Sequence, residues 1–230
     1  MSFEPHSGHR PGFDLLICDL DGTLVDTRDG IAATLRATLE EAGFPAPPPS
    51  EVYPLIGLPL DTLFRRFLPE ASADGLAARL VEAYRDRYRR TVTPHTRAFP
   101  GVAVTLDACR KAGLQLAVAT SKTVRIARET LEVAGLADAF ALVLGVDSVA
   151  RPKPAPDMVL RVLAELGAAP GRTLVVGDAG HDVAMGRSAG ARTCAVTYGV
   201  QTRAELLAAE PDCLVDRFGD VLGIVRAGLP

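Results

Sequence analysis

Short β-rich runs alternate with helical segments over most of this 230-residue chain, and this alternation restricts the fold more than any other feature of the sequence. Five runs have the length and composition of buried strands: Phe13–Cys18, Leu114–Ala119, Phe140–Leu144, Thr173–Val176 and Thr193–Thr197. Segments with helical periodicity stand beside the later runs: Val102–Ala112, Thr123–Ala134, Asp157–Leu166 and His181–Ala189. Strands and helices in alternation form a parallel sheet that is covered on both faces. We therefore predict an α/β fold in which ligands bind at the carboxyl ends of the strands.

A long segment between the first and second of these strands has helical periodicity alone. Apolar residues mark one helix from Ile31 to Ala42, a second from Leu60 to Leu68 and a third from Leu76 to Tyr88. We predict that residues 28–93 form an all-helical domain inserted into an α/β core domain, which comprises residues 1–27 and 94–230. The segments Asp26–Arg28 and Thr93–Pro100 are predicted hinges, because polar residues or prolines coincide there with a change of periodicity.

Charge and hydropathy limit the partners of the chain. A formal net charge of −3 indicates no basic surface for nucleic acid or for an anionic membrane. Residues 1–12 are polar and lack the apolar stretch of a secretory signal, and no apolar run approaches the length of a membrane span. We therefore expect a cytoplasmic protein that acts on a small molecule, with no nucleic-acid or membrane partner, as a monomer or a homodimer.

Two carboxylates, Asp19 and Asp21, follow the first strand directly, and Gly22 turns the backbone just after them. Residues two apart on a strand point the same way, so both carboxylates can converge on one point. They repel each other there unless a cation joins them, and a hard cation such as Mg²⁺ prefers oxygen ligands. The pair indicates a reaction in which one carboxylate attacks and the other transfers a proton. A turn in which Asp caps the following helix is the alternative interpretation.

Three further strand ends supply polar groups for such a site. The second strand is followed by Thr120–Lys122, where a hydroxyl and the backbone amides of a helix start favour an anion, although this pattern is also that of a helix cap. Lys153 is held between two prolines after the third strand. Asp178 and Asp182 follow the fourth strand. In a parallel sheet these groups all lie at the same edge as Asp19.

Four motifs in this order, DLDGTLVDT, VATSK, RPKPAPD and VGDAGHD, resemble those of the haloacid dehalogenase superfamily over nearly the whole chain. The resemblance is with the phosphatase branch that carries a helical cap domain after the first strand. His95–Val102 is similar to the cap-to-core junction of phosphoglycolate phosphatase-like members. The resemblance implies a Rossmann-like parallel-sheet core, an inserted all-helical cap and Mg²⁺-dependent hydrolysis of a phosphate monoester through an aspartyl-phosphate.

Residues of this chain that match the motifs are expected to have the roles of the corresponding residues in the family. Asp19 matches the nucleophile, and Asp21 matches the acid/base that protonates the leaving alcohol and then activates water. Lys153 matches the catalytic lysine, which also supplies positive charge to the phosphate. The implied Mg²⁺ ligands are Asp19, Asp21 through its backbone carbonyl, Asp178, and Asp182 directly or through water. The implied phosphate-binding groups are Thr120, Ser121, Lys153 and the backbone amide of Leu20, and Thr23 is expected to orient the site.

Two positions depart from the family's motifs. Ala179 stands where Thr or Ser is frequent, and Ser121 stands where Asn is frequent. One hydrogen bond that supports the metal loop is therefore expected to be missing. Because neither position is a catalytic one, we expect activity to be retained.

Several functions stay open at this point. Asp21 argues against a dehalogenase, which lacks the second aspartate, whereas a phosphomutase similar to β-phosphoglucomutase shares every motif. The presence of Asp29-Gly30, where a mutase would have a bulkier cap histidine, favours hydrolysis over phosphoryl transfer. A third alternative is a non-catalytic protein that binds a phosphorylated ligand. A substrate similar to 2-phosphoglycolate is favoured, with Arg65 and Arg66 as candidate cap ligands for its carboxylate, unless they belong to a solvated helix face. Pyrophosphate and sugar phosphates remain possible substrates.

Overall fold

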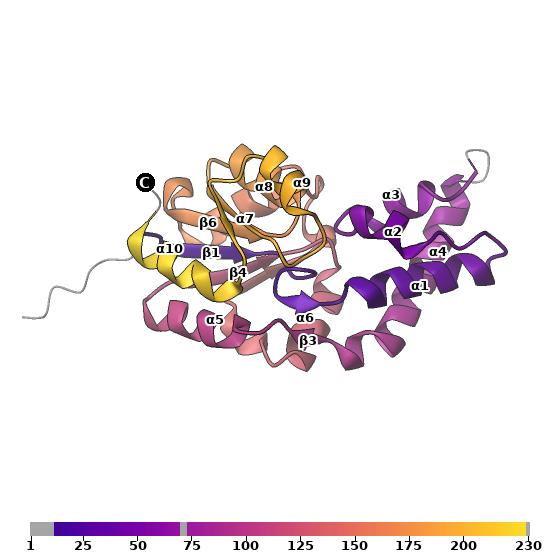
Figure 1. Cartoon of the computed structure of the whole chain (residues 1–230), viewed down its shortest axis with the longest axis horizontal. Coiled ribbons are helices and arrows are strands. Elements are labelled where there is room, and N and C mark those ends of the chain that lie inside the picture. The colour runs from indigo at the N-terminus through magenta and orange to yellow at the C-terminus, as the bar shows by residue number, and fades with distance from the viewer. Residues whose placement is uncertain (1–11, 70–72, 229–230) are drawn as a thin grey trace, which may run out of the picture.

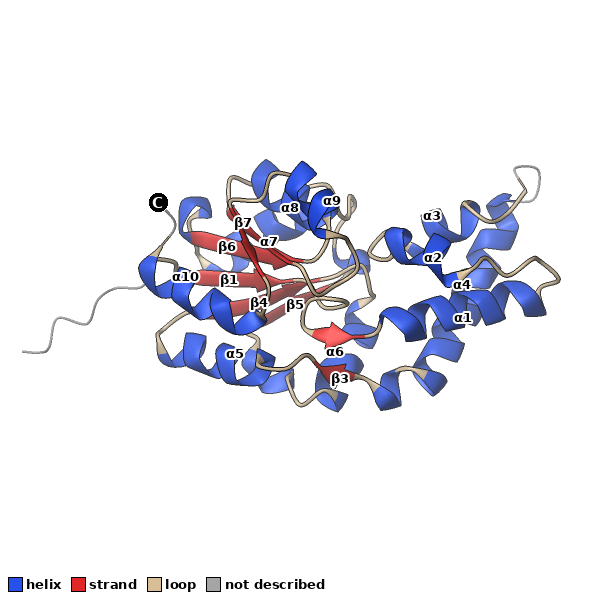
Figure 2. Ribbon diagram, in the orientation of Figure 1, coloured by secondary structure: helices blue, strands red, loops and turns tan. Residues whose placement is uncertain are grey.

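The computed structural model describes residues 12–69 and 73–228, so residues 1–11 and 229–230 of the predicted core domain lie outside it. A six-stranded parallel sheet has the order β5-β4-β1-β6-β7-β8 (Figure 2). Its strands are β1 (Leu15–Cys18), β4 (Gln115–Ala119), β5 (Leu142–Leu144), β6 (Thr173–Gly177), β7 (Arg192–Val196) and β8 (Cys213–Val215). The direction of chain progression reverses between β1 and β6, which opens a crevice at the carboxyl ends of these strands. The predicted α/β fold class is confirmed.

Helices cover both faces of the sheet. One face carries α5 (Val102–Lys111), α6 (Val124–Val133) and α10 (Val221–Ala227), and the other carries α7 (Asp157–Leu166) and α8 (Gly180–Ser188), beside which lies α9 (Arg203–Ala208). Successive strand residues point to opposite faces, so Leu16 joins the first apolar layer while Leu15 and Ile17 join the second. All three are fully buried. Burial of such a side chain contributes about 1.5–3 kcal/mol to stability, which fixes the register of β1.

Four helices form a lobe beyond the carboxyl ends of the strands (Figure 1): α1 (Arg28–Glu41), α2 (Pro49–Val52), α3 (Leu60–Arg65) and α4 (Ala73–Thr91). The lobe has an apolar cluster of its own, in which Leu35, Phe64 and Tyr88 are buried, and Ile126 of α6 packs against it from the core. This separate packing supports the predicted cap of residues 28–93. Its boundaries stay a prediction, and residues 70–72 lie outside the described part of the chain.

The chain passes between the two lobes through a small antiparallel ribbon of β2 (Val25–Asp26) and β3 (Arg97–Ala98). The two predicted hinge segments therefore lie side by side. The sequence did not predict this ribbon, because two-residue strands carry no periodicity. It also did not predict α2, α9, β8 or α10, which are short. Within the described residues, no helix combines the length and the apolar character that a membrane span requires.

Candidate active site

Three neighbouring strands deliver the central residues of the site. Cys18 at the end of β1 is in register with Val118 of β4 and Val176 of β6, so the residues that follow these strands converge. The backbone N–H of Asp19 donates to the carbonyl of Val176 at 2.9 Å, and that of Thr120 donates to the carbonyl of Leu144 at 3.0 Å. These bonds continue the ladder by one residue and fix where both side chains leave the backbone.

Three buried carboxylates, those of Asp19, Asp178 and Asp182, each offer an oxygen within 4.8 Å of the others. The Nζ of Lys153 lies 2.6 Å from Oδ1 of Asp19 and 2.6 Å from Oδ1 of Asp182, and its side chain is 1% exposed. Three carboxylates and one ammonium leave two uncompensated negative charges in a buried site, which is costly. A divalent cation would neutralise them, and three carboxylate oxygens are the donors that Mg²⁺ prefers. The donor set therefore fits the expected metal.

Hydrogen bonds from neighbouring loops hold the acidic groups in place. Thr23 Oγ1 donates to Oδ1 of Asp178 at 3.0 Å, and the backbone N–H of Val200 donates to its Oδ2 at 2.7 Å. The backbone N–H of Ala179 donates to Oδ2 of Asp182 at 3.2 Å, so a backbone contact remains where the family often has a hydroxyl side chain. Gly22 has φ of +81°, and a Cβ there would collide with the carboxylate of Asp178.

The crowded carboxylates have shifted pKa values. Burial raises the pKa of Asp19 to about 7, against the opposing effect of Lys153. Burial and the charge of Asp19 also raise the pKa of Asp178 well above its usual value. Burial acts on Asp182 in the same direction, but Lys153 outweighs it and the pKa of Asp182 is lowered. The two carboxylates likewise outweigh burial for Lys153, whose pKa is raised, so that it remains an ammonium ion.

Asp21 has a different environment from the other three aspartates. Its Oδ1 and Oδ2 each lie 2.7 Å from Nζ of Lys122, and Thr27 Oγ1 donates to its Oδ1 at 2.5 Å. Lys122 in turn lies 4.3 Å above the ring of Tyr88 in the helical lobe. The carboxylate of Asp21 therefore stands apart from the metal-binding group, and the predicted role of its backbone carbonyl as a ligand stays a prediction.

Of the predicted phosphate-binding residues, Lys153 contacts Asp19, and Thr120 and Ser121 follow β4, the strand beside β1. Thr120 is buried, and its Oγ1 accepts from the backbone N–H of Lys122 at 3.3 Å. Leu20 follows Asp19 directly and buries its side chain. Ser121 instead donates its hydroxyl to the carbonyl of Gly57 in the helical lobe. The Ser121 side chain thus links the two lobes in this structure, and the short serine side chain fits at this contact.

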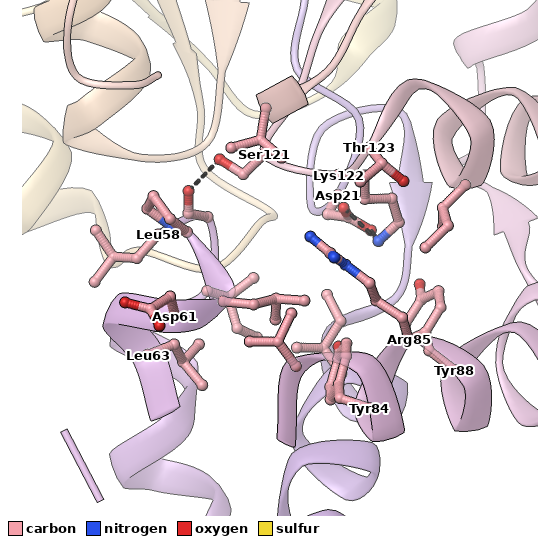
Figure 3. A pocket seen from close by; sticks show the side chains of 18 residues that line it. Asp21, Leu58, Asp61, Leu63, Tyr84, Arg85, Tyr88, Ser121, Lys122 and Thr123 are labelled. Carbon is pink, nitrogen blue, oxygen red and sulfur yellow. Dashed lines mark hydrogen bonds and ion pairs between the residues drawn. The ribbon is translucent and has the colours of Figure 1, made fainter. Parts of the chain in front are cut away.

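The structure does not bring the two predicted cap arginines to the site. Arg65, the last residue of α3, and Arg66, which follows it, are exposed, and Nε of Arg65 lies 2.6 Å from Oδ2 of Asp61. A cavity of about 210 Å³ between the lobes is instead lined by Arg85 of α4, together with Asp21 (Figure 3). Lys122 and Thr27 had no predicted role, and Arg85 was one of six cap arginines that were candidates for binding an acidic group, of which Arg65 and Arg66 were favoured. Lys122 stood within a recognised motif, whereas nothing in the sequence distinguished Arg85 from the other arginines of its helix.

The fold and this site define a class of protein, which comparison with known proteins also identifies. A model of the family described as "Haloacid dehalogenase-like hydrolase" matches residues 16–196, and the chain belongs to this family. The resemblance that the four motifs predicted is confirmed.

Individual relatives narrow the class further. The chain is 41% identical to "Probable phosphatase IndB" of Dickeya dadantii over 93% of this chain and 94% of the relative. It is 31% identical to a phosphoglycolate phosphatase of Aquifex aeolicus, with 92% and 96% covered. The crystal structure of a predicted phosphoglycolate phosphatase from Haemophilus somnus superposes with a TM-score of 0.84 at 28% identity, with 93% of this chain and 98% of that chain covered.

Proposed function

We propose that this protein is a Mg²⁺-dependent phosphatase that hydrolyses a small phosphate monoester through an aspartyl-phosphate on Asp19. The observation that carries the proposal is the buried cluster in which Lys153 joins Asp19 and Asp182 beside Asp178. With all three carboxylates ionised, the site would repel a dianionic substrate unless a metal ion is bound. Mg²⁺ bound by these carboxylates would neutralise charge on the phosphate and lower its repulsion from Asp19.

In the first step an oxygen of Asp19 attacks phosphorus, and the bond from phosphorus to the leaving oxygen breaks. Asp21 gives its proton to that oxygen, which departs as an alcohol. Lys153 places its ammonium beside the attacking carboxylate and stabilises the charge that develops on the phosphoryl oxygens. In the second step Asp21 removes a proton from a water molecule, which attacks the aspartyl-phosphate and releases inorganic phosphate and free Asp19.

Lys122 and Thr27 support this assignment for Asp21. Both residues belong to the predicted core domain and contact the carboxylate of Asp21, which lines the cavity between the lobes where a leaving alcohol would lie. A proton-transferring group must be fixed within hydrogen-bond reach of its target, and these contacts provide that orientation. Lys122 and Thr27 are therefore proposed as positioning residues.

The substrate that we propose to test first is 2-phosphoglycolate, because several relatives bear the name phosphoglycolate phosphatase. Gly30 also favours hydrolysis over phosphoryl transfer between sugar oxygens. A Cβ at this position would collide with the side chain of Val92, which leaves no room for the cap histidine expected of a mutase. Cytoplasmic location and the oligomeric state stay predictions.

The test is the release of inorganic phosphate, with and without EDTA, from 2-phosphoglycolate, pyrophosphate, hexose phosphates and nucleoside monophosphates. We expect Mg²⁺-dependent release that Asp19→Asn abolishes while the variant keeps the circular dichroism spectrum of the wild type. Asp107→Asn is the matched control, since Asp107 pairs with Lys111 on the surface of α5. Equal rates for wild type and Asp19→Asn would show that Asp19 is not the nucleophile.

A further inference from the structure

The cavity between the two lobes has walls that differ in chemistry on its two sides. The core side carries Asp21 and the segment Ser121–Thr123 (Figure 3). The cavity as a whole is mostly apolar, and the helical lobe contributes to its wall, together with the charged residues Asp61 and Arg85, the apolar residues Ile31, Ile56, Leu63 and Val81. These four side chains are at most 7% exposed. A leaving group attached to a phosphate at Asp19 would extend past Asp21 into this apolar space.

The size of the cavity exceeds what a two-carbon leaving group fills. Its volume is about 210 Å³. For comparison, an apolar protein cavity of roughly 150 Å³ accommodates one benzene molecule. Glycolate, with two carbons and a carboxylate, would leave most of the apolar wall without contact. A six-membered ring with a substituent would instead use both the volume and the apolar lining.

Aromatic side chains form one end of this wall. Tyr84 and Tyr88 lie one turn apart on α4 with their rings stacked at 5.8 Å between centroids, and the ring of Phe64 meets Tyr84 edge-on at 6.0 Å. Both tyrosines line the cavity. Because Tyr88 already carries Lys122 over its ring and Tyr84 against it, a flat ligand would meet this rigid aromatic surface edge-on, with little loss of conformational entropy.

One cation enters the cavity from the same helix. Arg85 is a lining residue, and Figure 3 shows its side chain reaching from α4 toward the segment of Ser121 and Lys122. Its Nη1 lies 2.5 Å from Oε1 of Glu82, a residue whose side chain is 72% exposed. This ion pair uses one edge of the guanidinium, and the remaining N–H groups of the planar fork can donate to a further carbonyl or carboxylate oxygen.

We infer that the preferred substrate is a phosphate monoester whose leaving alcohol carries a flat, largely apolar ring with an oxygen acceptor for Arg85. The inference rests on the proposed function and replaces 2-phosphoglycolate as its preferred substrate. The ring occupies the space between α1, α3 and α4, and the acceptor lies at the Arg85 end.

The experiment compares kcat/KM for benzyl phosphate, ethyl phosphate and 2-phosphoglycolate. These esters release primary alcohols, so the chemical step is of similar difficulty and the ring is the main variable between the first two. Each added methylene in an apolar pocket changes kcat/KM by about tenfold or more. We therefore expect benzyl phosphate to exceed both ethyl phosphate and 2-phosphoglycolate at least tenfold. Turnover of 2-phosphoglycolate equal to or above that of benzyl phosphate would overturn the inference and leave the phosphatase assignment standing.

Variants test the location of the ring. Val81→Phe fills the apolar side of the cavity and should reduce the ratio of kcat/KM for benzyl phosphate over ethyl phosphate by at least tenfold. Val104→Phe, at a position 76% exposed on α5, is the matched control and should leave this ratio unchanged. The ratio is measured within one protein sample, so a partly unfolded variant does not distort it. An unchanged ratio in Val81→Phe would place the ring outside this cavity and overturn the inference.

The acceptor is tested with 4-carboxybenzyl phosphate. We expect the wild type to have a higher kcat/KM for this ester than for benzyl phosphate, because the carboxylate accepts from Arg85. Arg85→Gln should abolish this difference, and Arg90→Gln, on the same helix and 67% exposed, should retain it. The same loss in both variants would refute the role of Arg85. If no ester released phosphate and Asp19→Asn matched the wild type, the proposed function itself would fail.

Discussion

Replacement of Lys153 by methionine tests whether the ammonium of Lys153 balances the charge of the buried carboxylates, as the structure indicates. Lys153 contacts Asp19 and Asp182 at 2.6 Å each, with its side chain 1% exposed. Lys153→Met keeps most of the side-chain volume but leaves two buried carboxylates without their cation. Removal of one partner from a buried ion pair costs about 3–5 kcal/mol. At roughly 2–4 °C per kcal/mol for a chain of this size, the melting temperature should fall by about 6–20 °C.

The assay is thermal unfolding for the melting temperature and urea unfolding for the free energy of unfolding, both followed by circular dichroism in EDTA at pH 7.5 and at pH 5. Lysine remains charged throughout this range, so the pH dependence comes from the carboxylates. Without the ammonium, which lowers the pKa values of Asp19 and Asp182, both folded-state pKa values rise, and an acid with a raised pKa loses stability as pH increases. The deficit of the variant should therefore be larger at pH 7.5 than at pH 5.

A matched control separates this effect from the loss of any lysine. Lys111 also pairs with an aspartate, Asp107, at 2.6 Å, but its side chain is 75% exposed. Lys111→Met should unfold close to the wild type, because exposed ion pairs contribute little. If Lys153→Met lost less than about 1 kcal/mol relative to this control, the buried charge balance described here would be wrong.

Three further predictions follow from the contacts of the site. Burial raises the pKa of Asp19 to about 7 and also raises the pKa of Asp178, so both carboxyl groups are more fully ionised at pH 8 than at pH 5.5. Mg²⁺ should therefore raise the melting temperature more at pH 8, and equal shifts at the two pH values would contradict this. Lys122→Met should lower kcat about 10–100-fold with little change in KM, because Asp21 loses its orienting partner while substrate contacts remain; a change confined to KM would assign Lys122 to binding. Thr23→Val removes a hydrogen bond to Asp178 and should weaken Mg²⁺ binding about 10–100-fold in a calorimetric titration, whereas unaltered affinity would show that this contact does not position the ligand.

The sequence predicted the parts of the fold that periodicity controls. The helix predicted at Asp157–Leu166 has those bounds in α7, and the strand predicted at Leu114–Ala119 differs from β4 by one residue. The short elements after residue 197 were missed, because a three-residue strand such as Cys213–Val215 does not establish a period. The ribbon that pairs Val25–Asp26 with Arg97–Ala98 joins segments too distant in the chain for local patterns to connect them.

The same distinction applies to the site. Asp19, Thr120 and Asp178 could be predicted to converge, because each follows a strand of one parallel sheet. The pairing of Asp21 with Lys122 spans 101 positions and depends on side-chain direction, which the motif alone does not give. The composition of the cavity depends on which face of α4 meets the core, so Arg85 could be distinguished from its neighbours only after the helices had packed.

Nucleophilic attack by Asp19 is tested most directly by identifying the residue that carries the phosphoryl group during turnover. Wild type and Asp21→Asn would be mixed with substrate and Mg²⁺, quenched within milliseconds, reduced with borohydride and digested for mass spectrometry. Acyl phosphates are reduced to alcohols, so nucleophilic attack by Asp19 predicts homoserine at position 19. Because Asp21 acts in both steps, Asp21→Asn should change the amount of homoserine but not its position. Reduction at another carboxylate, or at none during active phosphate release, would contradict nucleophilic attack by Asp19.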